Sequence, residues 1–144
     1  MDNPLILTID FGTQSLRTCL INKQGDILAL ERIKYAPPYF SNEPGFAEQN
    51  PDFYFEALCK CTKTLAKKSP ELMEQIAGIS MAFFRDSVVC VDKNGVPLRP
   101  AILWLDERRA EGKEKLPLLS RIIFKLVGMG PTIELNRKRS MAVW

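Results

Sequence analysis

The stretch LTIDFGTQSLRTCLI, at residues 7–21, constrains the fold of this chain more than any other. Two β-like runs, Leu5–Asp10 and Leu16–Ile21, flank the polar turn FGTQS. A second turn follows at residues 22–26 and leads into a third β-like run, Ile27–Tyr35. The sequence therefore predicts an antiparallel three-stranded meander over residues 5–35.

The first of these turns carries more polar groups than a hairpin needs. Asp10 ends a strand, which presents its carboxylate at the strand tip, and Gly12 allows a tight turn that a ligand can approach closely. Backbone N–H groups in such a turn, the hydroxyls of Thr13 and Ser15, and the fork of Arg17 suit a polyphosphate, with magnesium near the carboxylate. A hairpin turn capped by an Asp side chain is the simpler alternative for these residue types.

A helix is expected at about residues 51–67. Asn50 can cap it, and Pro51 suits its first position. Lysines take one side of the helix, which makes it amphipathic. The expected apolar stripe recurs at spacings of three and four and consists of Phe55, Leu58, Cys59, Thr62, Leu65 and Ala66.

The remainder of the chain alternates between further β-like and helix-like runs. Residues 76–83, 87–92 and 101–105 read as strands, the first of them as a buried strand. A charged helix start is expected at residues 106–115, and an amphipathic helical tail at residues 118–127. This order predicts an α/β layer fold.

Composition excludes several classes of function. In the 144 residues, apolar residues make up 46% and charged residues 26%, which is the balance of a soluble globular protein. The net charge of +3 does not favour a nucleic-acid partner, and solvated charge is the preferred interpretation of the basic run at residues 136–139. No apolar run is long enough to span a membrane.

Histidine is absent, which removes the commonest general base and the usual zinc ligand from this chain. Chemistry here would depend on carboxylates, metal, backbone amides and arginine. Four cysteines in a chain of this length are not a disulfide framework. Together with the lack of a secretory signal, they predict reduced thiols in a cytoplasmic protein.

Two later stretches suggest a substrate surface. Arg85 and Asp86 can bind a polyol, because the guanidinium donates to hydroxyls and the carboxylate accepts from them; a surface ion pair is the alternative. Trp104 could stack on a sugar face, with Asp106 and Arg108 following at the strand end. The alternative for this stretch is a core tryptophan followed by a charged helix cap.

Taken together, these stretches resemble the N-terminal part of the FGGY family of carbohydrate kinases, which includes glycerol, xylulose and ribulose kinases. The resemblance covers roughly residues 5–109. It is carried by DFGTQSLR, by PGFAEQNP with its following helix, by GIS at residues 78–80, and by DKNGVPLRPAILWLDERR. It implies the ribonuclease H-like fold of actin, hexokinase and sugar kinases.

The resemblance also implies site residues. Asp10 is expected to lie near magnesium, through water. Residues matching the family's phosphate-binding hairpin, and so expected to contact ATP, are Asp10, Gly12, Thr13, Gln14, Ser15 and Arg17. Residues matching its substrate pocket are Arg85, Asp86, Trp104, Asp106 and Arg108. The residues around the Arg-Asp pair depart from both the glycerol kinase and the xylulose kinase patterns, so the substrate is not identified.

Family members are much longer, with two such domains around a cleft. Residues 1–144 are therefore expected to be part of an N-terminal domain, with the C-terminal domain and the catalytic base absent. The parent protein is expected to be an enzyme that phosphorylates a sugar or polyol hydroxyl with ATP, while this chain alone is inactive. A non-catalytic regulatory or scaffold protein built from the kinase fold is the alternative. Family members are often dimers, so the resemblance allows a homodimer.

Overall fold

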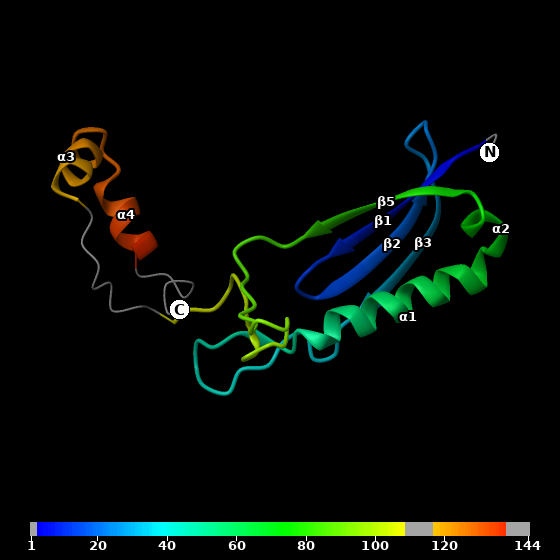
Figure 1. The fold of residues 1–144 in the computed structure, drawn as a ribbon, viewed down its shortest axis with the longest axis horizontal. Helices are drawn as coiled ribbons and strands as arrows, with labels where there is room; N and C mark the ends of the chain where they lie inside the picture. Colours follow the sequence, from blue (N-terminus) through cyan, green and yellow to red (C-terminus); the bar gives the residue numbers. More distant parts are fainter. Residues whose placement is uncertain (1–2, 109–116, 138–144) are drawn as a thin grey trace.

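A computed structural model of the protein describes residues 3–108 and 117–137. Its centre is a four-stranded mixed sheet in the order β3-β2-β1-β5 (Figure 1). The first three strands form the antiparallel meander predicted from the sequence, and β5 pairs with β1 in parallel. The strands are β1 (Leu5–Phe11), β2 (Ser15–Ile21), β3 (Ile27–Lys34) and β5 (Ile76–Phe83).

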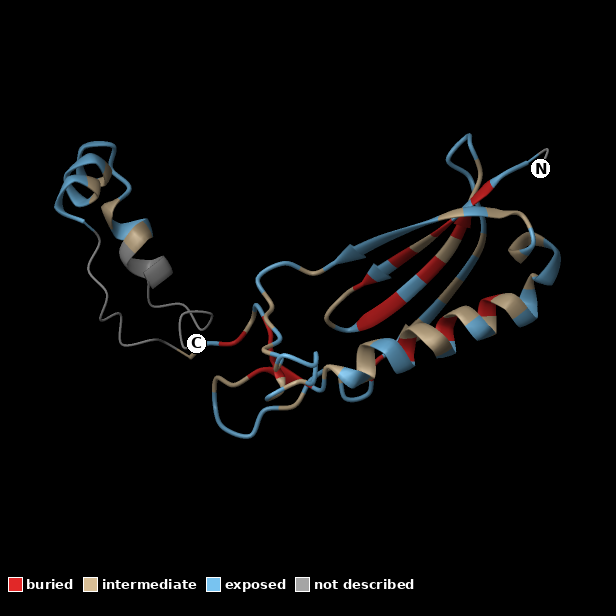
Figure 2. Cartoon of the chain, viewed as in Figure 1, coloured by how far each residue is buried: buried red, intermediate tan, exposed pale blue. Residues whose placement is uncertain are grey.

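Alternation along β1 and β2 places every second side chain in the core. Leu5, Leu7, Ile9 and Phe11 are at most 5% exposed, and Leu16 on β2 is fully buried. The helix α1 (Asp52–Lys68) covers this face of the meander (Figure 1). Figure 2 shows buried residues along these two strands and along the helix, with further buried segments around β4 and β6.

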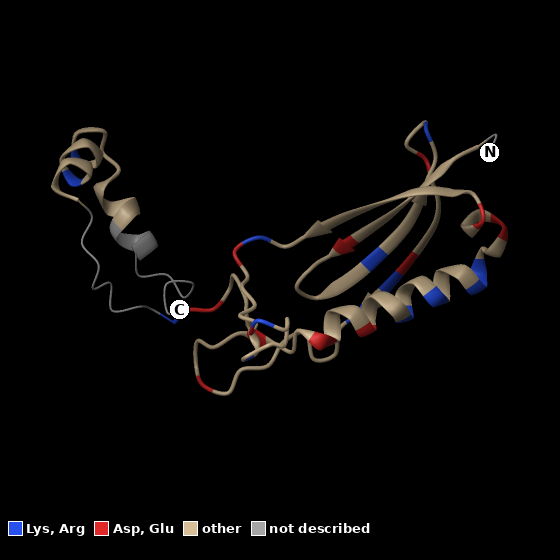
Figure 3. Ribbon diagram, in the orientation of Figure 1, with Lys and Arg blue, Asp and Glu red and all other residues tan. Residues whose placement is uncertain are grey.

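Helix α1 begins at Asp52, one residue after the predicted first position, and its buried face overlaps only partly with the predicted stripe, since Leu65 belongs to both. Asn50 Oδ1 accepts a hydrogen bond from the backbone N–H of Asp52 at 3.1 Å. The residues buried against the sheet are Ala57, Cys61 and Leu65. Phe55, placed in the stripe by its spacing, is 70% exposed. The buried face thus includes the small residue Ala57, which the predicted stripe omitted. The lysines of α1 are exposed, and Figure 3 shows basic bands along this helix.

The prediction that residues 76–83 form a buried strand is half right. The strand exists, but β5 lies at the edge of the sheet with β1 as its one neighbour in the described residues. Ile79, Met81 and Phe83 are 64%, 56% and 61% exposed, and Figure 2 shows β5 largely in the exposed colour. Helix α1 packs over β2 and β3, which leaves this row beyond its reach.

The segment after β5 contains less regular structure than predicted. Residues 87–92 form only single bridges, Val88 to Ile102 and Val91 to Pro97, and the strand expected at 101–105 shortens to β6 (Ala101–Ile102). β6 pairs with β4 (Glu48–Gln49), which lies in the Pro-rich loop. In this region, backbone hydrogen bonds between loops take the place of a longer strand ladder.

Three further helices complete the described residues: α2 (Pro70–Met73), α3 (Leu118–Leu126) and α4 (Gly130–Arg137). α3 confirms the predicted helical tail, whereas α4 falls where no element was expected. Residues 106–108 are not helical, and the rest of the predicted helix start, at 109–115, lies outside the described residues, as do Lys138 and Arg139 of the basic run at 136–139. Among the described helices, none has the length and apolar character needed to cross a membrane.

Candidate functional site

The turn between β1 and β2 is closed by its own backbone. The Gly12 N–H donates to the Ser15 carbonyl at 3.0 Å. A Cβ on residue 12 would lie 3.1 Å from that same oxygen, so a larger residue would require the turn to shift by a few tenths of an ångström. Gly12 therefore contributes shape, since its N–H is already used within the turn. Arg17 lies opposite Asp10 in the β1–β2 register, and its Nη1 contacts Asp10 Oδ2 at 3.3 Å.

The other side chains of the predicted phosphate hairpin differ in exposure. Asp10 and Arg17 are about half exposed, at 53% and 48% of their side-chain surface, and Gln14 is exposed. Thr13 is half-buried, whereas Ser15 is only 6% exposed. The surface open to a ligand is thus formed mainly by Asp10, Thr13, Gln14 and Arg17.

Trp104 joins the predicted substrate surface to this turn. Its indole Nε1 donates to Thr13 Oγ1 at 2.9 Å, across 91 positions of sequence. Its backbone N–H donates to Ser87 Oγ at 3.1 Å, which ties it to the segment after β5. The ring is 58% exposed, so it forms an open wall beside the hairpin and not a core residue.

Arg85 and Asp86 come directly after β5, where the chain leaves the sheet, and both are exposed. The Phe84 N–H donates to the Phe11 carbonyl at 3.1 Å, which fixes the start of this segment beside β1. Asp86 has a φ of 57°, in the left-handed region that aspartate tolerates better than most residues. The pair therefore lies at the same end of the sheet as the β1–β2 turn.

An apolar hollow of about 220 Å³ lies at this end of the sheet. Its walls include Phe11 and Phe83, whose rings stack with centroids 4.7 Å apart, and Ser87, which anchors Trp104. Apolar walls with a few polar groups at the rim are typical of small-molecule sites.

Asp106 and Arg108 are placed differently from the rest of the predicted substrate residues. The Asp106 side chain is 0% exposed, and that of Arg108 is 17% exposed. Arg108 donates through Nε and Nη2 to the Asp106 carboxylate, and the Ala47 N–H donates to it at 2.9 Å. Arg108 also contacts Glu48 at 2.9 Å and covers the ring of Phe46. The geometry supports a role in holding two loops together, and substrate contact by this pair stays a prediction.

Electrostatics keep this cluster ionised. Burial alone would raise the pKa of Asp106, but hydrogen bonds from the Arg108 side chain and from the Ala47 N–H outweigh it and hold that pKa below its ordinary value. The same contact with Asp106 raises the pKa of Arg108. The ion pair therefore persists across the neutral range.

Sequence reasoning missed three residues that support the site: Gln49, Tyr54 and Ser87. Gln49 is 3% exposed and donates through Nε2 to the Thr13 carbonyl at 2.9 Å. The Tyr54 hydroxyl donates to Gln49 Oε1 at 2.6 Å. A polar residue in a Pro-rich loop gives no local signal of burial, but Gln49 lies in the PGFAEQNP stretch that carries the family resemblance, and that stretch could have drawn attention to it.

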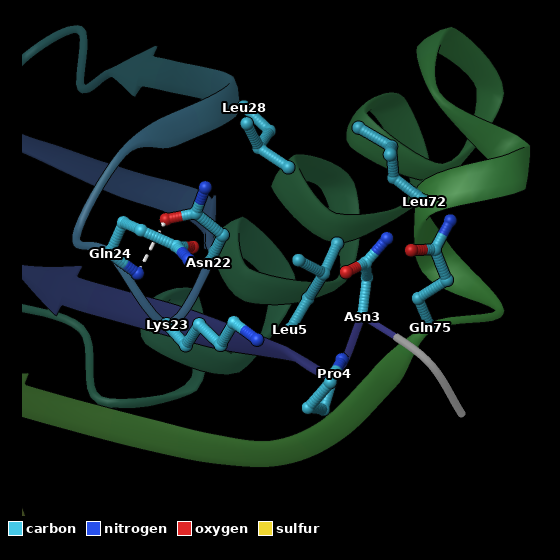
Figure 4. A pocket seen from close by; sticks show the side chains of 9 residues that line it. All are labelled: Asn3, Pro4, Leu5, Asn22, Lys23, Gln24, Leu28, Leu72 and Gln75. Atoms are coloured by element: carbon cyan, nitrogen blue, oxygen red, sulfur yellow. Dashed lines mark hydrogen bonds between the residues drawn. The ribbon is translucent and has the colours of Figure 1, made fainter.

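A larger hollow, of about 310 Å³, lies at the opposite end of the sheet, between the start of β1, the β2–β3 turn and α2 (Figure 4). Lys23 is the single ionisable residue among those that line it in the described part of the chain. Asn22 Oδ1 accepts from the Gln24 N–H at 3.0 Å, within its own turn. This hollow is more polar than the first one, because Asn3, Asn22, Lys23, Gln24 and Gln75 are among its lining residues.

The residues at the hairpin fit a magnesium ion bound through a phosphate. Among the described residues there is no group of three or more acidic, histidine or cysteine side chains that could hold a metal alone. Mg²⁺ commonly keeps several waters and uses one or two carboxylates together with substrate phosphates. The half-exposed Asp10 carboxylate at the strand end suits that arrangement.

Comparison with known proteins identifies the family. The model of the N-terminal domain of the FGGY family of carbohydrate kinases matches residues 5–123. The gluconokinase of Bacillus subtilis is 36% identical over 126 residues, which are 85% of this chain and 24% of that protein. The xylulose kinase of Staphylococcus epidermidis is 33% identical over 110 residues, 76% of this chain and 22% of that protein. The chain thus spans about a quarter of the length of these curated relatives.

Solved structures agree on the fold. The xylulose kinase from Rhodospirillum rubrum superposes with a TM-score of 0.69 at 24% identity, covering 75% of this chain and 22% of that one. The gluconate kinase from Lactobacillus acidophilus gives 0.66 at 23% identity, over 91% of this chain and 24% of that one. The expected α/β fold of sugar kinases is therefore confirmed, and this chain belongs to the FGGY family of carbohydrate kinases.

Proposed function

We propose that this chain supplies the phosphate-binding hairpin and one wall of the substrate pocket to a kinase that transfers the γ-phosphoryl of ATP to a hydroxyl of a sugar or polyol. The observation that carries the proposal is the 2.9 Å hydrogen bond from Trp104 to Thr13. It places side by side two surfaces, one suited to phosphate and one suited to a sugar ring. Membership in a family of carbohydrate kinases supports the same reaction.

Each exposed group has a defined task in this proposal. Asp10 orients water-bound Mg²⁺, and Arg17, 3.3 Å from it, both fixes that carboxylate and offers positive charge to the phosphates. The Thr13 hydroxyl and the backbone at Gln14 face the phosphates. Trp104 packs on the apolar face of the sugar. Bound ATP with Mg²⁺ supplies the transferable phosphoryl group.

Arg85 and Asp86 orient the substrate hydroxyls through complementary donors and acceptors. Asp106 and Arg108 act behind them by holding the loop that carries Trp104. We place the base that accepts the hydroxyl proton outside these 144 residues, because the relatives are about four times as long. The sugar or polyol is a small molecule, and no nucleic acid or membrane takes part.

Binding and turnover test this proposal separately. In the 144-residue chain, titration with Mg–ATP should shift the backbone amide resonances of residues 12–15 and the indole resonance of Trp104. Asp10→Asn should remove the magnesium dependence of these shifts, whereas Asp26→Asn, in the exposed β2–β3 turn, should leave it intact. Shifts that ignore magnesium, or that fall elsewhere on the chain, would refute the assignment of the hairpin.

Turnover is measured on the natural protein that contains this sequence, with ATP, magnesium and a panel of ketoses, polyols and sugar acids. We expect phosphorylation of at least one compound, and no turnover by the 144-residue chain alone. Binding of Mg–ATP without phosphorylation of any compound would instead support a regulatory protein built from the kinase fold.

A further inference from the structure

We propose that Gln49 is a positioning residue that holds the turn of residues 12–15 at the spacing where Thr13 meets Trp104. The proposal rests on the proposed function, because it concerns the same phosphate-binding turn. Gln49 does not face the open surface, so its effect on a ligand would be transmitted through Thr13.

The side-chain amide of Gln49 connects three segments that are distant in sequence. It is 3% exposed. Its Nε2 donates to the Thr13 carbonyl at 2.9 Å and also to the Pro38 carbonyl. Its Oε1 accepts from the Tyr54 hydroxyl on α1 at 2.6 Å. One buried amide thus joins the turn, the Pro-rich loop and the helix.

The orientation of this amide follows from its partners. Two of them are carbonyl oxygens, which can only accept, and the third is a phenol that donates to Oε1. Reversing the amide would place Oε1 against the carbonyls of Thr13 and Pro38 and leave buried groups unpaired. Neither Glu nor Met can replace it, because neither donates the two hydrogen bonds that the carbonyls require.

The backbone of Gln49 completes the connection. Gln49 pairs with Ala101 in the β4–β6 ladder, and the chain continues from Ala101 to Trp104. Thr13 is therefore held twice: its carbonyl by Gln49, and its hydroxyl by Trp104. β4 carries Gln49, and β6 leads directly to Trp104. Because these two strands are paired with each other, a shift at Gln49 must alter the geometry between the turn and the Trp104 indole.

The experiment uses the 144-residue chain with Trp144→Phe, which leaves Trp104 as the one remaining tryptophan of two. Gln49→Met removes the donated bonds at similar volume. Its matched control is Gln75→Met, since Gln75 makes an exposed 3.1 Å bond to the Glu71 carbonyl on α2. The readouts are the indole N–H resonance of Trp104 and the titration of amide shifts with Mg–tripolyphosphate, the phosphate part of ATP.

We expect Gln49→Met to move the indole resonance and to weaken phosphate binding about tenfold, the effect of losing roughly one hydrogen bond. Gln75→Met should change neither. Normal indole and phosphate signals in Gln49→Met would overturn the positioning role while leaving the proposed function standing. If the Trp144→Phe chain without a further substitution bound no Mg–tripolyphosphate, the proposed phosphate-binding role of the turn would be refuted. The indole resonance of Trp104 would still test the positioning role of Gln49.

A second variant covers the case in which Gln49→Met does not fold. Tyr54→Phe removes only the hydroxyl that fixes the orientation of the amide and leaves its donors in place. We expect a smaller shift of the Trp104 indole resonance in the same direction. An unchanged resonance in this variant would also overturn the proposal.

Discussion

Asp106→Asn should destabilise the loops around the candidate site, and it should lower the free energy of unfolding more than replacement of an exposed carboxylate does. The Asp106 side chain is fully buried and accepts hydrogen bonds from Arg108 and from the Ala47 N–H. Hydrogen bonds to charged groups contribute about 1.5–3 kcal/mol each. Removing one partner of a buried pair costs about 3–5 kcal/mol. Arg108 keeps Glu48 at 2.9 Å and is 17% exposed. We therefore expect a loss of about 2–3 kcal/mol, below the range for a fully buried pair.

Urea unfolding followed by circular dichroism measures this loss at pH 7. The matched control is Asp26→Asn, which changes an exposed carboxylate in the β2–β3 turn and should cost under about 0.5 kcal/mol. If Asp106→Asn destabilised the chain no more than this control, the buried ion pair could not be holding the two loops together.

The same variant should alter acid unfolding. The pKa of Asp106 is lower in the folded chain than its ordinary value of 3.8, so the unfolded chain takes up this proton at a higher pH. The stability that Asp106 contributes is complete above that value and is lost as pH falls through the lower, folded pKa. Asp106→Asn should therefore show a shallower fall in stability below about pH 4. An unchanged dependence of stability on pH would contradict the contacts of Asp106 with Arg108 and Ala47.

Three other predictions concern the core. Burial raises the pKa of Tyr35 to about 12, so stability should fall as pH rises from about 10 towards 12, and Tyr35→Phe should remove that fall in unfolding midpoints. Burial also raises the pKa of the Cys61 thiol, so mass mapping should find it labelled by a disulfide reagent more slowly than the half-buried Cys59; equal rates would count against this packing. Leu20→Ala, at a fully buried position, should cost about 2–5 kcal/mol, whereas Leu30→Ala, at 51% exposure, should cost under about 1 kcal/mol in urea unfolding.

The meander was predictable because its signals are local. Alternation of period two and short polar turns determine where β1, β2 and β3 run, and they bring Asp10 opposite Arg17. The burial of β5 was not predictable in this way. An apolar run such as Ile76–Phe83 reads as a core strand, but its burial depends on which neighbours the rest of the protein provides.

The candidate site likewise contains residues that local motifs indicate and residues whose placement depends on contacts distant in sequence. Short motifs in the sequence indicated the hairpin and Trp104 as candidates, and the structure brings Thr13 and Trp104 into contact. Asp106 was expected in the pocket because it follows the same motif, but its partners include Ala47, 59 positions earlier. The role of Gln49 was missed for a similar reason: PGFAEQNP was recognised as a motif, but the burial of Gln49 comes from contacts with Thr13 and Pro38 across the fold.

The topology of the sheet also sets an order for its assembly. Asp10 and Arg17 are 7 positions apart, so the β1–β2 hairpin closes a short loop and can form on a timescale of about 1–10 μs. Leu7 meets Ile79 only after the Pro-rich loop and α1 have brought the chain back, and long loops close at a greater entropic cost. We therefore expect the hairpin to be among the first parts of the nascent chain to become ordered, and β5 to join the sheet last. The turn of residues 12–15 would then be in place before the edge strand beside it arrives.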